Sequence, residues 1–352
     1  MSSVACRIEQ VKVGKDQEVL QLRELPLEEA LPSRARTGFV IVRVTLRPMQ
    51  PIDLFLIRYG HPLPHLNLPF PHVIGCEGFG IIHQHVIFHC KLCTGGRRCD
   101  TVQCGQRVVL LVWLEYHQHG QGSWQDFVEL EEEQVIAVPL SVSDEAAAQF
   151  FLNPWTAYGL LDDQAVPMGE YLLQTAASSS VGRSVIQIAK HYGIKTINIV
   201  RKDAWKEELK ALGADEVINS ETEDVVERVK DITGGKLAYA AVDAVGGSLT
   251  KTIAAAVKDR GRVLVYGVFS GWDVTVSTTE LMRGVQVSWW WLFPDYVLTR
   301  AKRAEVAKEV MKLLAHNIIT PCTSEKFPLK DFIAAISKSE KPSGFEKVLL
   351  VT

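Results

Sequence analysis

The sequence predicts an α/β protein with two domains. Over the first 150 residues, short apolar strands are separated by Gly and Pro and helical periodicity is nearly absent, which is typical of an all-β domain such as a partly closed barrel. Beyond Ser143, apolar strands alternate with amphipathic helices, which predicts a parallel sheet covered on both faces. A chain of 352 residues is also too long for one hydrophobic core.

The β-rich region is expected to begin with a strand around the alternating residues Val4, Cys6 and Ile8. The other strands expected there are Val40–Leu46, Gly78–His83, Val108–Trp113, Asp126–Leu130 and Val135–Val138.

The alternating region begins with a short apolar strand and continues as strand–helix pairs, in which Gly213 and the pair Gly234–Gly235 end two of the helices. The expected strands are Tyr171–Gln174, Thr196–Val200, Glu216–Ile218, Ala240–Asp243 and Arg262–Tyr266. The expected helices are Val181–Tyr192, Ala204–Leu212, Thr222–Ile232, Leu249–Val257 and Lys302–Leu314.

Charge and hydropathy exclude two classes of partner. Lys and Arg number 38 against 41 Asp and Glu, a net charge of -3, which gives no field for binding nucleic acid or an anionic membrane. No apolar run approaches the roughly 20 residues that a membrane span needs. The N-terminus lacks a signal-peptide core and the seven cysteines are an odd number, so we expect a cytoplasmic protein with reduced thiols.

A dinucleotide site is predicted where the strand Tyr171–Gln174 leads into a turn of small residues and then directly into a helix. Small side chains let the backbone approach a diphosphate, and the helix N-terminus offers N–H groups and positive potential. We expect the diphosphate at Ser178, Ser179, Ser180 and Val181. Serine stands at two positions where glycine is usual, and the alternative interpretation is a Ser-rich helix cap.

The cofactor is predicted to be NADPH because Arg201 and Lys202 follow the second strand of the alternating region. A site for NADH usually has a carboxylate near this point that binds the ribose 2′-OH, whereas two cations match a 2′-phosphate. Asp203 is the adjacent carboxylate. The alternative is that all three are solvated surface charges.

The chain resembles the medium-chain dehydrogenase/reductase superfamily over nearly its full length. The motifs in the family's order are a turn at Pro51–Leu54, Tyr59-Gly60, Gly75–Gly78, Gln106–Val108 and a turn at Ser178–Gly182. Within it, the chain looks most like the zinc-independent trans-2-enoyl thioester reductases of mitochondrial fatty acid synthesis, on the segments Asn153–Tyr158, Gly193–Arg201 and Trp290–Leu292. Quinone reductases share much of this frame.

The resemblance implies a GroES-like, β-barrel-type catalytic domain of residues 1–150, completed by residues 297–352. Residues 151–296 would form a Rossmann domain, a doubly wound parallel sheet that binds NADP. It also implies a homodimer, and it makes a mitochondrial location the alternative to a cytoplasmic one.

By this resemblance, Tyr59 acts on the substrate. Hydride delivery to the β-carbon of an enoyl thioester moves negative charge onto the carbonyl oxygen, and a phenol that is protonated at neutral pH can donate a hydrogen bond to that enolate. It can also pass a proton toward the α-carbon. The alternative is a tyrosine that only packs in a loop.

Further cofactor contacts follow from matched motifs, although aromatic residues among them are equally compatible with core packing. The residues are Asn153, Tyr266, Gly267, Val268, Phe269, Trp290, Trp291, Leu292 and Lys347, with Arg201, Lys202 and Asp203 facing the adenosine end.

No metal is expected. Zinc alcohol dehydrogenases of the superfamily have three catalytic ligands. At the corresponding places this chain has Pro51–Asp53, Cys76 and the neighbourhood of Leu152, so only one thiol remains of the roughly three ligands needed. The alternative is a structural zinc held by four cysteines spaced within one loop: Cys90, Cys93, Cys99 and Cys104.

The function implied is NADPH-dependent reduction of trans-2-enoyl thioesters, on coenzyme A or acyl carrier protein, to saturated acyl thioesters. An NADPH quinone or enone oxidoreductase is the alternative with the same fold and cofactor. A non-catalytic NADPH-binding protein, which senses redox state or serves a structural role, is an alternative of another class.

Overall fold

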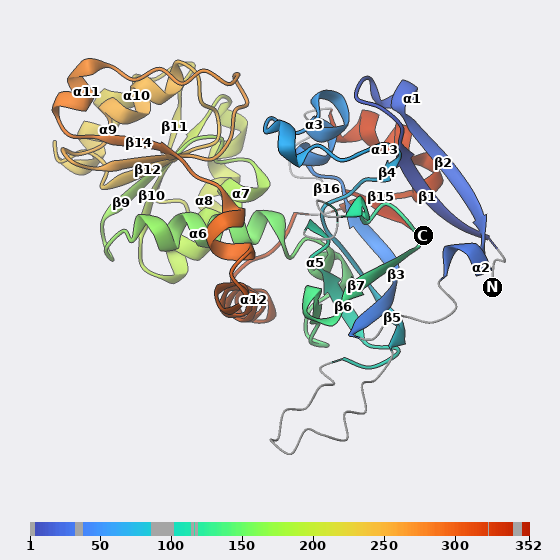
Figure 1. The fold of residues 1–352 in the computed structure, drawn as a ribbon. Helices are drawn as coiled ribbons and strands as arrows, with labels where there is room; N and C mark the ends of the chain where they lie inside the picture. The colour runs from blue at the N-terminus through green and yellow to red at the C-terminus, as the bar shows by residue number, and fades with distance from the viewer. Residues whose placement is uncertain are drawn as a thin grey trace. The chain divides into compact units, whose positions relative to one another are not determined.

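The computed structural model describes residues 4–31, 38–85, 102–113, 116, 119–322, 324–340 and 347–352. The chain divides into two compact units. Unit 1 comprises residues 1–152 and 322–352, and unit 2 comprises residues 153–321. The first is rich in strands, whereas the second alternates strands and helices (Figure 1).

Unit 1 contains two sheets in which nearly all neighbouring strands are antiparallel. The smaller has the order β2-β1-β4, and the larger the order β15-β16-β3-β5-β6-β8, with β7 also paired to β3. The described pairing does not close a ring, in agreement with the predicted partly closed barrel. The strands are β1 (Val4–Gln10), β2 (Leu20–Pro26), β3 (Phe39–Pro48), β4 (His72–Val73), β5 (Gly78–His85), β6 (Arg107–Leu110), β7 (Phe127–Glu131), β8 (Val135–Ala137), β15 (Ser324–Pro328) and β16 (Lys347–Val351).

A helix occupies the segment that the sequence analysis treated as a turn, so the expected near-absence of helices in this region was wrong. The helix α3 (Pro51–Tyr59) has Pro at its start and Gly60, with φ of 72°, directly after its end. Pro suits the first helical position and only glycine adopts the positive φ freely, so both end signals were present in the sequence. The other described helices of unit 1 are α1 (Asp16–Val19), α2 (Leu27–Ala30), α5 (Asp144–Ala148) and α13 (Phe332–Ser339).

Unit 2 is built on one six-stranded sheet in which every pair is parallel, as predicted. Its order is β11-β10-β9-β12-β13-β14, the doubly wound order of a Rossmann-like domain. The chain therefore reverses its direction of winding between β9 and β12. The strands are β9 (Tyr171–Gln174), β10 (Lys195–Val200), β11 (Glu216–Asn219), β12 (Ala240–Asp243), β13 (Arg262–Val265) and β14 (Gln286–Trp289).

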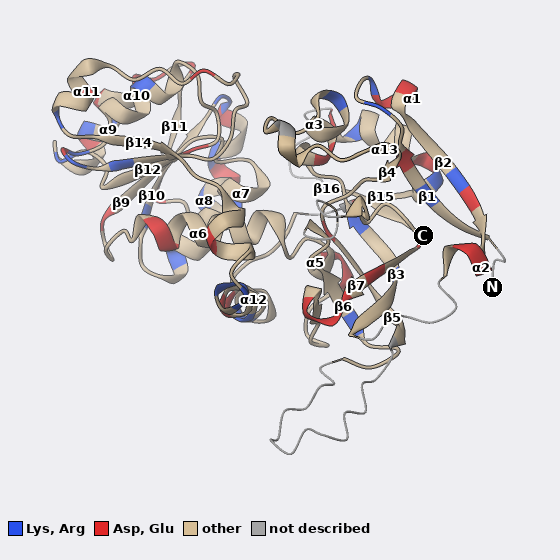
Figure 2. Ribbon diagram, viewed as in Figure 1, with Lys and Arg blue, Asp and Glu red and all other residues tan. Residues whose placement is uncertain are grey.

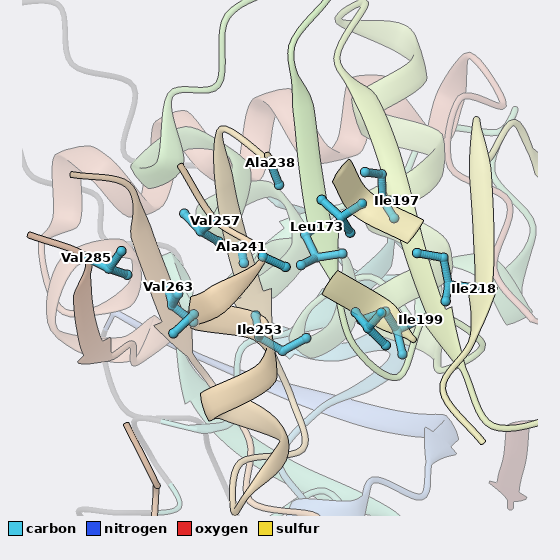
Figure 3. Packing of buried hydrophobic residues seen from close by; sticks show 14 of the residues in the cluster. Leu173, Ile197, Ile199, Ile218, Ala238, Ala241, Ile253, Val257, Val263 and Val285 are labelled. Carbon is cyan, nitrogen blue, oxygen red and sulfur yellow. The ribbon is translucent and has the colours of Figure 1, made fainter. Parts of the chain in front are cut away.

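Apolar side chains cover both faces of this sheet. On one face Leu173 and Val263 pack with Ile253 of a covering helix (Figure 3). On the other face Ile186 and Leu209 come from two further helices. The described helices of unit 2 are α6 (Leu152–Gln164), which starts one residue before the unit boundary, α7 (Ser180–His191), α8 (Lys206–Leu212), α9 (Val225–Thr233), α10 (Leu249–Ala255), α11 (Thr278–Met282) and α12 (Arg300–Ala315).

The second domain boundary differs from the predicted one. The predicted return to the first domain was at residue 297, whereas the chain returns at Cys322. The reason is α12, which belongs to unit 2: Lys302 forms an ion pair of 3.0 Å with Asp162 of α6, and Val306 and Val310 are fully buried.

Charged residues of both signs are interspersed over both units (Figure 2). None of the described helices is long and apolar enough to cross a membrane.

Gly182 is predicted to be indispensable for packing α7 onto the preceding turn. A Cβ at this position would lie 2.7 Å from the Cα of Ala177, closer than real contacts allow. We expect Gly182→Ala to lower the free energy of unfolding by about 1–3 kcal/mol, measured by urea denaturation. Ser184→Ala, on the same helix, loses only a hydrogen bond to the Ser180 carbonyl and should change it by less than about 1 kcal/mol. Equal stability of the two variants would contradict this.

Candidate active site

Most of the predicted cofactor residues lie at one edge of the sheet in unit 2. Because β9, β10, β13 and β14 are parallel, the residues that follow each of them gather at the carboxyl edge, where open α/β sheets bind ligands. The residues so placed are Ser178 to Val181 after β9, Arg201 to Asp203 after β10, Tyr266 to Phe269 after β13, and Trp290 to Leu292 after β14.

The turn after β9 is short and tightly packed. Ala176 has a positive φ of 48°, and Ser179 caps α7 by accepting a hydrogen bond of 3.1 Å from the Gly182 N–H. This capping role is the alternative that the sequence left open for the serines, and Ser179 fills it. Capping still leaves a twelve-residue helix whose N-terminal dipole and N–H groups point to the carboxyl edge of the sheet.

The three charged residues that follow β10 differ in whether they have a partner. Asp203 is bound by Lys206, with 2.8 Å between the carboxylate and the ammonium. Hydrogen bonds from Lys206 and Asn219 lower the pKa of Asp203. In contrast, Arg201 and Lys202 are exposed and neither has a carboxylate partner within the described part of the chain. This edge of the sheet therefore presents two cations and a carboxylate that is already neutralised.

Asp243, the last residue of β12, was not among the predicted site residues and also lies at this edge. Asp243 is fully buried and accepts hydrogen bonds of 2.7 Å from both Thr175 and Thr250. Beside it, the buried Tyr266 hydroxyl has no hydrogen-bond partner among the described residues. Burial and the Asp243 charge raise the pKa of this phenol. The pair Gly246-Gly247 directly after an apolar strand was the available sequence signal.

The residues after β14 differ among themselves. The Trp290 indole is buried, donates to Asp163 of α6 and lies against Gly159, which is the core packing that the sequence left open as an alternative. Leu292 is buried as well, whereas Trp289 is 52% exposed.

Three predicted residues do not follow a strand of this sheet. Asn153 is the second residue of α6. Lys347 and Tyr59 belong to unit 1. Lys347 is buried, and its Nζ donates to Gln50.

Tyr59 is the last residue of α3 and is open to solvent. Its side chain is 72% exposed, and its ring lies 5.2 Å from that of Phe55 on the same helix. The preceding residue, Arg58, is held by Asp16 and Glu340, which raise the pKa of its guanidinium. The phenol is therefore accessible at the end of an anchored helix, rather than packed in a loop.

Asp53 and Cys76, which the family resemblance matches to catalytic zinc positions, are both buried in unit 1. Burial raises the pKa of the Cys76 thiol well above its usual range. Asp53 accepts a hydrogen bond of 3.1 Å from the Cys76 N–H, which engages its carboxylate. Within the described residues, no three His, Cys, Asp or Glu side chains group around one point. Of the alternative cysteine cluster, Cys90, Cys93 and Cys99 lie outside the described residues, and Cys104 is exposed.

The fold and this sheet edge define a two-domain protein with a Rossmann-like unit, and comparisons with known proteins agree. The family model described as zinc-binding dehydrogenase matches residues 180–321. The chain is 31% identical over 343 residues to the mitochondrial enoyl-[acyl-carrier-protein] reductase of Caenorhabditis elegans, covering 93% of this chain and 91% of that protein. It is 30% identical over 325 residues to the Dictyostelium discoideum protein of the same name, covering 88% and 85%.

A solved structure extends the similarity to the whole fold. The Escherichia coli quinone oxidoreductase complexed with NADPH matches with a TM-score of 0.82 and 28% identity, over 99% of this chain and 100% of that one. The protein belongs to the zinc-binding dehydrogenase family, the medium-chain dehydrogenases/reductases, which confirms the resemblance predicted from its motifs.

Because of Glu77, the free energy of unfolding is predicted to fall as the pH rises from about 4.5 to about 7. Burial raises the pKa of its carboxyl from 4.5 to about 7, so the folded protein keeps a proton that the unfolded chain has lost. The stability contributed by Glu77 therefore decreases between about pH 4.5 and pH 7. We expect the urea midpoint of the wild type to fall more steeply over this interval than that of Glu77→Gln.

The control is Glu145→Gln, at an exposed carboxylate paired with Lys326. The hydrogen bond from that lysine lowers the pKa of Glu145, so folding does not make this carboxyl bind an extra proton, and its removal should preserve the wild-type slope. Parallel pH profiles for the wild type and Glu77→Gln would contradict the prediction.

Proposed function

We propose that this protein uses NADPH to reduce trans-2-enoyl thioesters, carried on coenzyme A or acyl carrier protein, to saturated acyl thioesters. The observation that supports this most directly is the similarity over almost the entire chain to proteins named enoyl-[acyl-carrier-protein] reductase, at 30% and 31% identity. These relatives cover both units of the chain, and the similarity therefore includes the β-rich unit that contains Tyr59.

The carboxyl edge of unit 2 suits a dinucleotide. The absence of a Cβ at Gly182 lets α7 pack closely on the turn at Ala177, so that the N-terminus of α7 and Ser178 to Val181 can hold the diphosphate. The unpartnered Tyr266 hydroxyl supplies a hydrogen-bonding group at the same edge. Arg201 and Lys202 would bind the 2′-phosphate, which favours NADPH over NADH.

When bound, NADPH supplies the hydride that is added to the β-carbon of the enoyl group. The electron pair of the double bond then moves toward the thioester carbonyl oxygen. Tyr59 would donate a hydrogen bond from its hydroxyl to that oxygen, which stabilises the negative charge, and the α-carbon takes a proton from Tyr59 or from water. Its 72% exposure leaves the hydroxyl accessible to such a substrate.

A quinone or enone oxidoreductase is the second candidate. It is favoured by the Escherichia coli quinone oxidoreductase complexed with NADPH, whose fold matches with a TM-score of 0.82. The chemistry is related, because a quinone carbonyl also gains negative charge on hydride addition and also needs a donor.

Location and assembly are part of the proposal. Both curated relatives are named mitochondrial, and we extend that location to this chain. A homodimer is proposed through the outer edge of β14, which ends the sheet of unit 2 and lies near the exposed side chains of Leu281, Met282 and Trp289.

Tyr59→Phe is predicted to lower kcat for crotonyl-CoA by about 100-fold while the Kd for NADPH changes by less than about twofold, because only the transition-state hydrogen bond is lost. NADPH oxidation is followed with crotonyl-CoA and, in parallel, with a quinone. Tyr192→Phe, which removes another solvent-accessible tyrosine hydroxyl, is the control and should retain wild-type turnover.

Each possible outcome of these assays would contradict a different part of the proposal. Turnover of the quinone but not of crotonyl-CoA would replace the proposed substrate by the second candidate. Tight NADPH binding without turnover of either would favour the non-catalytic alternative. Unchanged crotonyl-CoA turnover by Tyr59→Phe would remove Tyr59 from the reaction.

Arg201→Ala is predicted to weaken NADPH binding about tenfold or more while NADH binding stays within about twofold, because a charge-assisted hydrogen bond to the 2′-phosphate is lost. Isothermal titration with both cofactors measures the change. The control is Lys195→Ala, which removes a cation at the first residue of β10, the strand that precedes Arg201. It should change the affinity for neither cofactor. An equal loss for NADPH and NADH would show that Arg201 does not recognise the 2′-phosphate.

A further inference from the structure

Unit 1 contains a buried polar cluster that the proposed chemistry does not use. Its members are only 1–8% exposed and come from segments far apart in the chain: Gln50 precedes α3, Asp53 lies in its first turn, Glu77 precedes β5 and Lys347 begins β16. Two carboxyl groups and an ammonium in a protein interior are costly unless each is paired. Their burial therefore has to be compensated by hydrogen bonds or ion pairs within the protein.

The amide of Gln50 joins the charged members. Lys347 donates from Nζ to Gln50 Oε1, and Gln50 donates from Nε2 to Glu77 Oε1. A neutral amide is the side chain that accepts on one side and donates on the other, so both neighbours fix its orientation. Glu77 uses its second oxygen to accept from the backbone N–H groups of Phe151 and Leu152, at 3.1 and 2.9 Å.

Gln50 is also the residue from which α3 begins. Its backbone N–H donates to Asp53 Oδ2 at 2.9 Å, and the other oxygen of Asp53 accepts from the Cys76 N–H. The first turn of the helix is thus bonded to Glu77 and Lys347 through the Gln50 side chain, and to the segment before β5 through Asp53.

The far end of α3 is fastened as well. The carbonyl of Ile57 accepts hydrogen bonds from the Gln10 side chain at 3.0 Å and from the Gly14 N–H at 3.1 Å. Tyr59 follows two residues later and ends the helix. A nine-residue helix behaves as a short rigid rod, so a shift at its first turn displaces its last residue.

We propose that Gln50 is a positioning residue for Tyr59: held between Lys347 and Glu77, it fixes the first turn of α3 and thereby the place of the phenol at the other end of that helix. This rests on the proposed role of Tyr59 in the reduction. In this proposal, Gln50 affects turnover only through the position of Tyr59.

A double-mutant cycle tests the proposal. Gln50→Ala should lower kcat with crotonyl-CoA by about 10- to 100-fold, because catalytic groups displaced by about 1 Å lose that much, and should leave the Kd for NADPH within about twofold. In the Tyr59→Phe background, the same substitution should lower kcat by less than about threefold, since two residues that act as one unit are not additive.

The matched control is Gln149→Ala. Gln149 is 3% exposed in the same unit, and its amide donates to the Glu145 and Cys322 carbonyls, neither of which belongs to α3. It should leave kcat unchanged in both backgrounds. Hydrogen exchange provides a readout that does not depend on turnover. Within residues 51–60, the backbone amides (all except Pro51, which has none) should exchange faster in Gln50→Ala and at the wild-type rate in Gln149→Ala.

Glu77→Gln is the second variant if Gln50→Ala does not fold. It keeps the size of the side chain but cannot accept hydrogen bonds on both sides. As in Gln50→Ala, kcat should therefore fall and amide exchange in residues 51–60 should become faster. Losses that multiply in the double mutant, or unchanged exchange in residues 51–60, would overturn the positioning role. If the wild type does not turn over thioesters, the proposed function is refuted. The hydrogen-exchange rates of residues 51–60 would then still show whether Gln50 holds α3 in place.

Discussion

The parallel pairing of β9 with both β10 and β12 is the constraint on which the candidate cofactor site depends. Parallel strands put all their carboxyl ends on one edge, and the reversal of winding between β9 and β12 opens a place there that the connecting helices do not fill. Segments separated by up to about a hundred residues, from the turn at Ser178 to Trp290, thereby reach the same edge. No side chain of the site needs to contact another for this convergence to occur.

Unit 1 is organised by a different constraint, the need to compensate buried charge. Arg47 is fully buried. Its Nε and Nη2 donate to the carbonyls of Ser123 and Gln125 and Nη2 lies 3.5 Å from Asp126, which connects β3 to the segment before β7, whereas Nη1 has no partner among the described residues. The group around Gln50 and Glu77 connects α3, β5 and β16 in the same way. Both sets place charged side chains in the interior of unit 1, which ties its distant segments to one another by directional bonds as well as by apolar packing.

The sequence predicted the elements of unit 2 well, because strands such as Tyr171–Gln174 and Ala240–Asp243 are short apolar runs bounded by turns or helices, and both were predicted with the observed bounds. It missed α3, since Pro51 was interpreted as part of a turn although proline is also favoured at a first helical position. It could not reveal the partners of Gln50, because Glu77 and Lys347 are 27 and 297 residues away along the chain. It placed Trp290 near the cofactor by motif alone, without information on the indole's burial against α6.

The ion pair between Asp203 and Lys206 has a consequence for any attempt to re-engineer the coenzyme preference of this enzyme class. A preference for NADH requires a carboxylate that accepts hydrogen bonds from the adenosine ribose hydroxyls. Asp203, three residues after the end of β10, is at the sequence position expected for that carboxylate. That group is already engaged by the ammonium of Lys206. On the proposal that Arg201 and Lys202 bind the 2′-phosphate, removing them would abolish one preference without creating the other. Releasing Asp203 would require a change at Lys206, the first residue of α8.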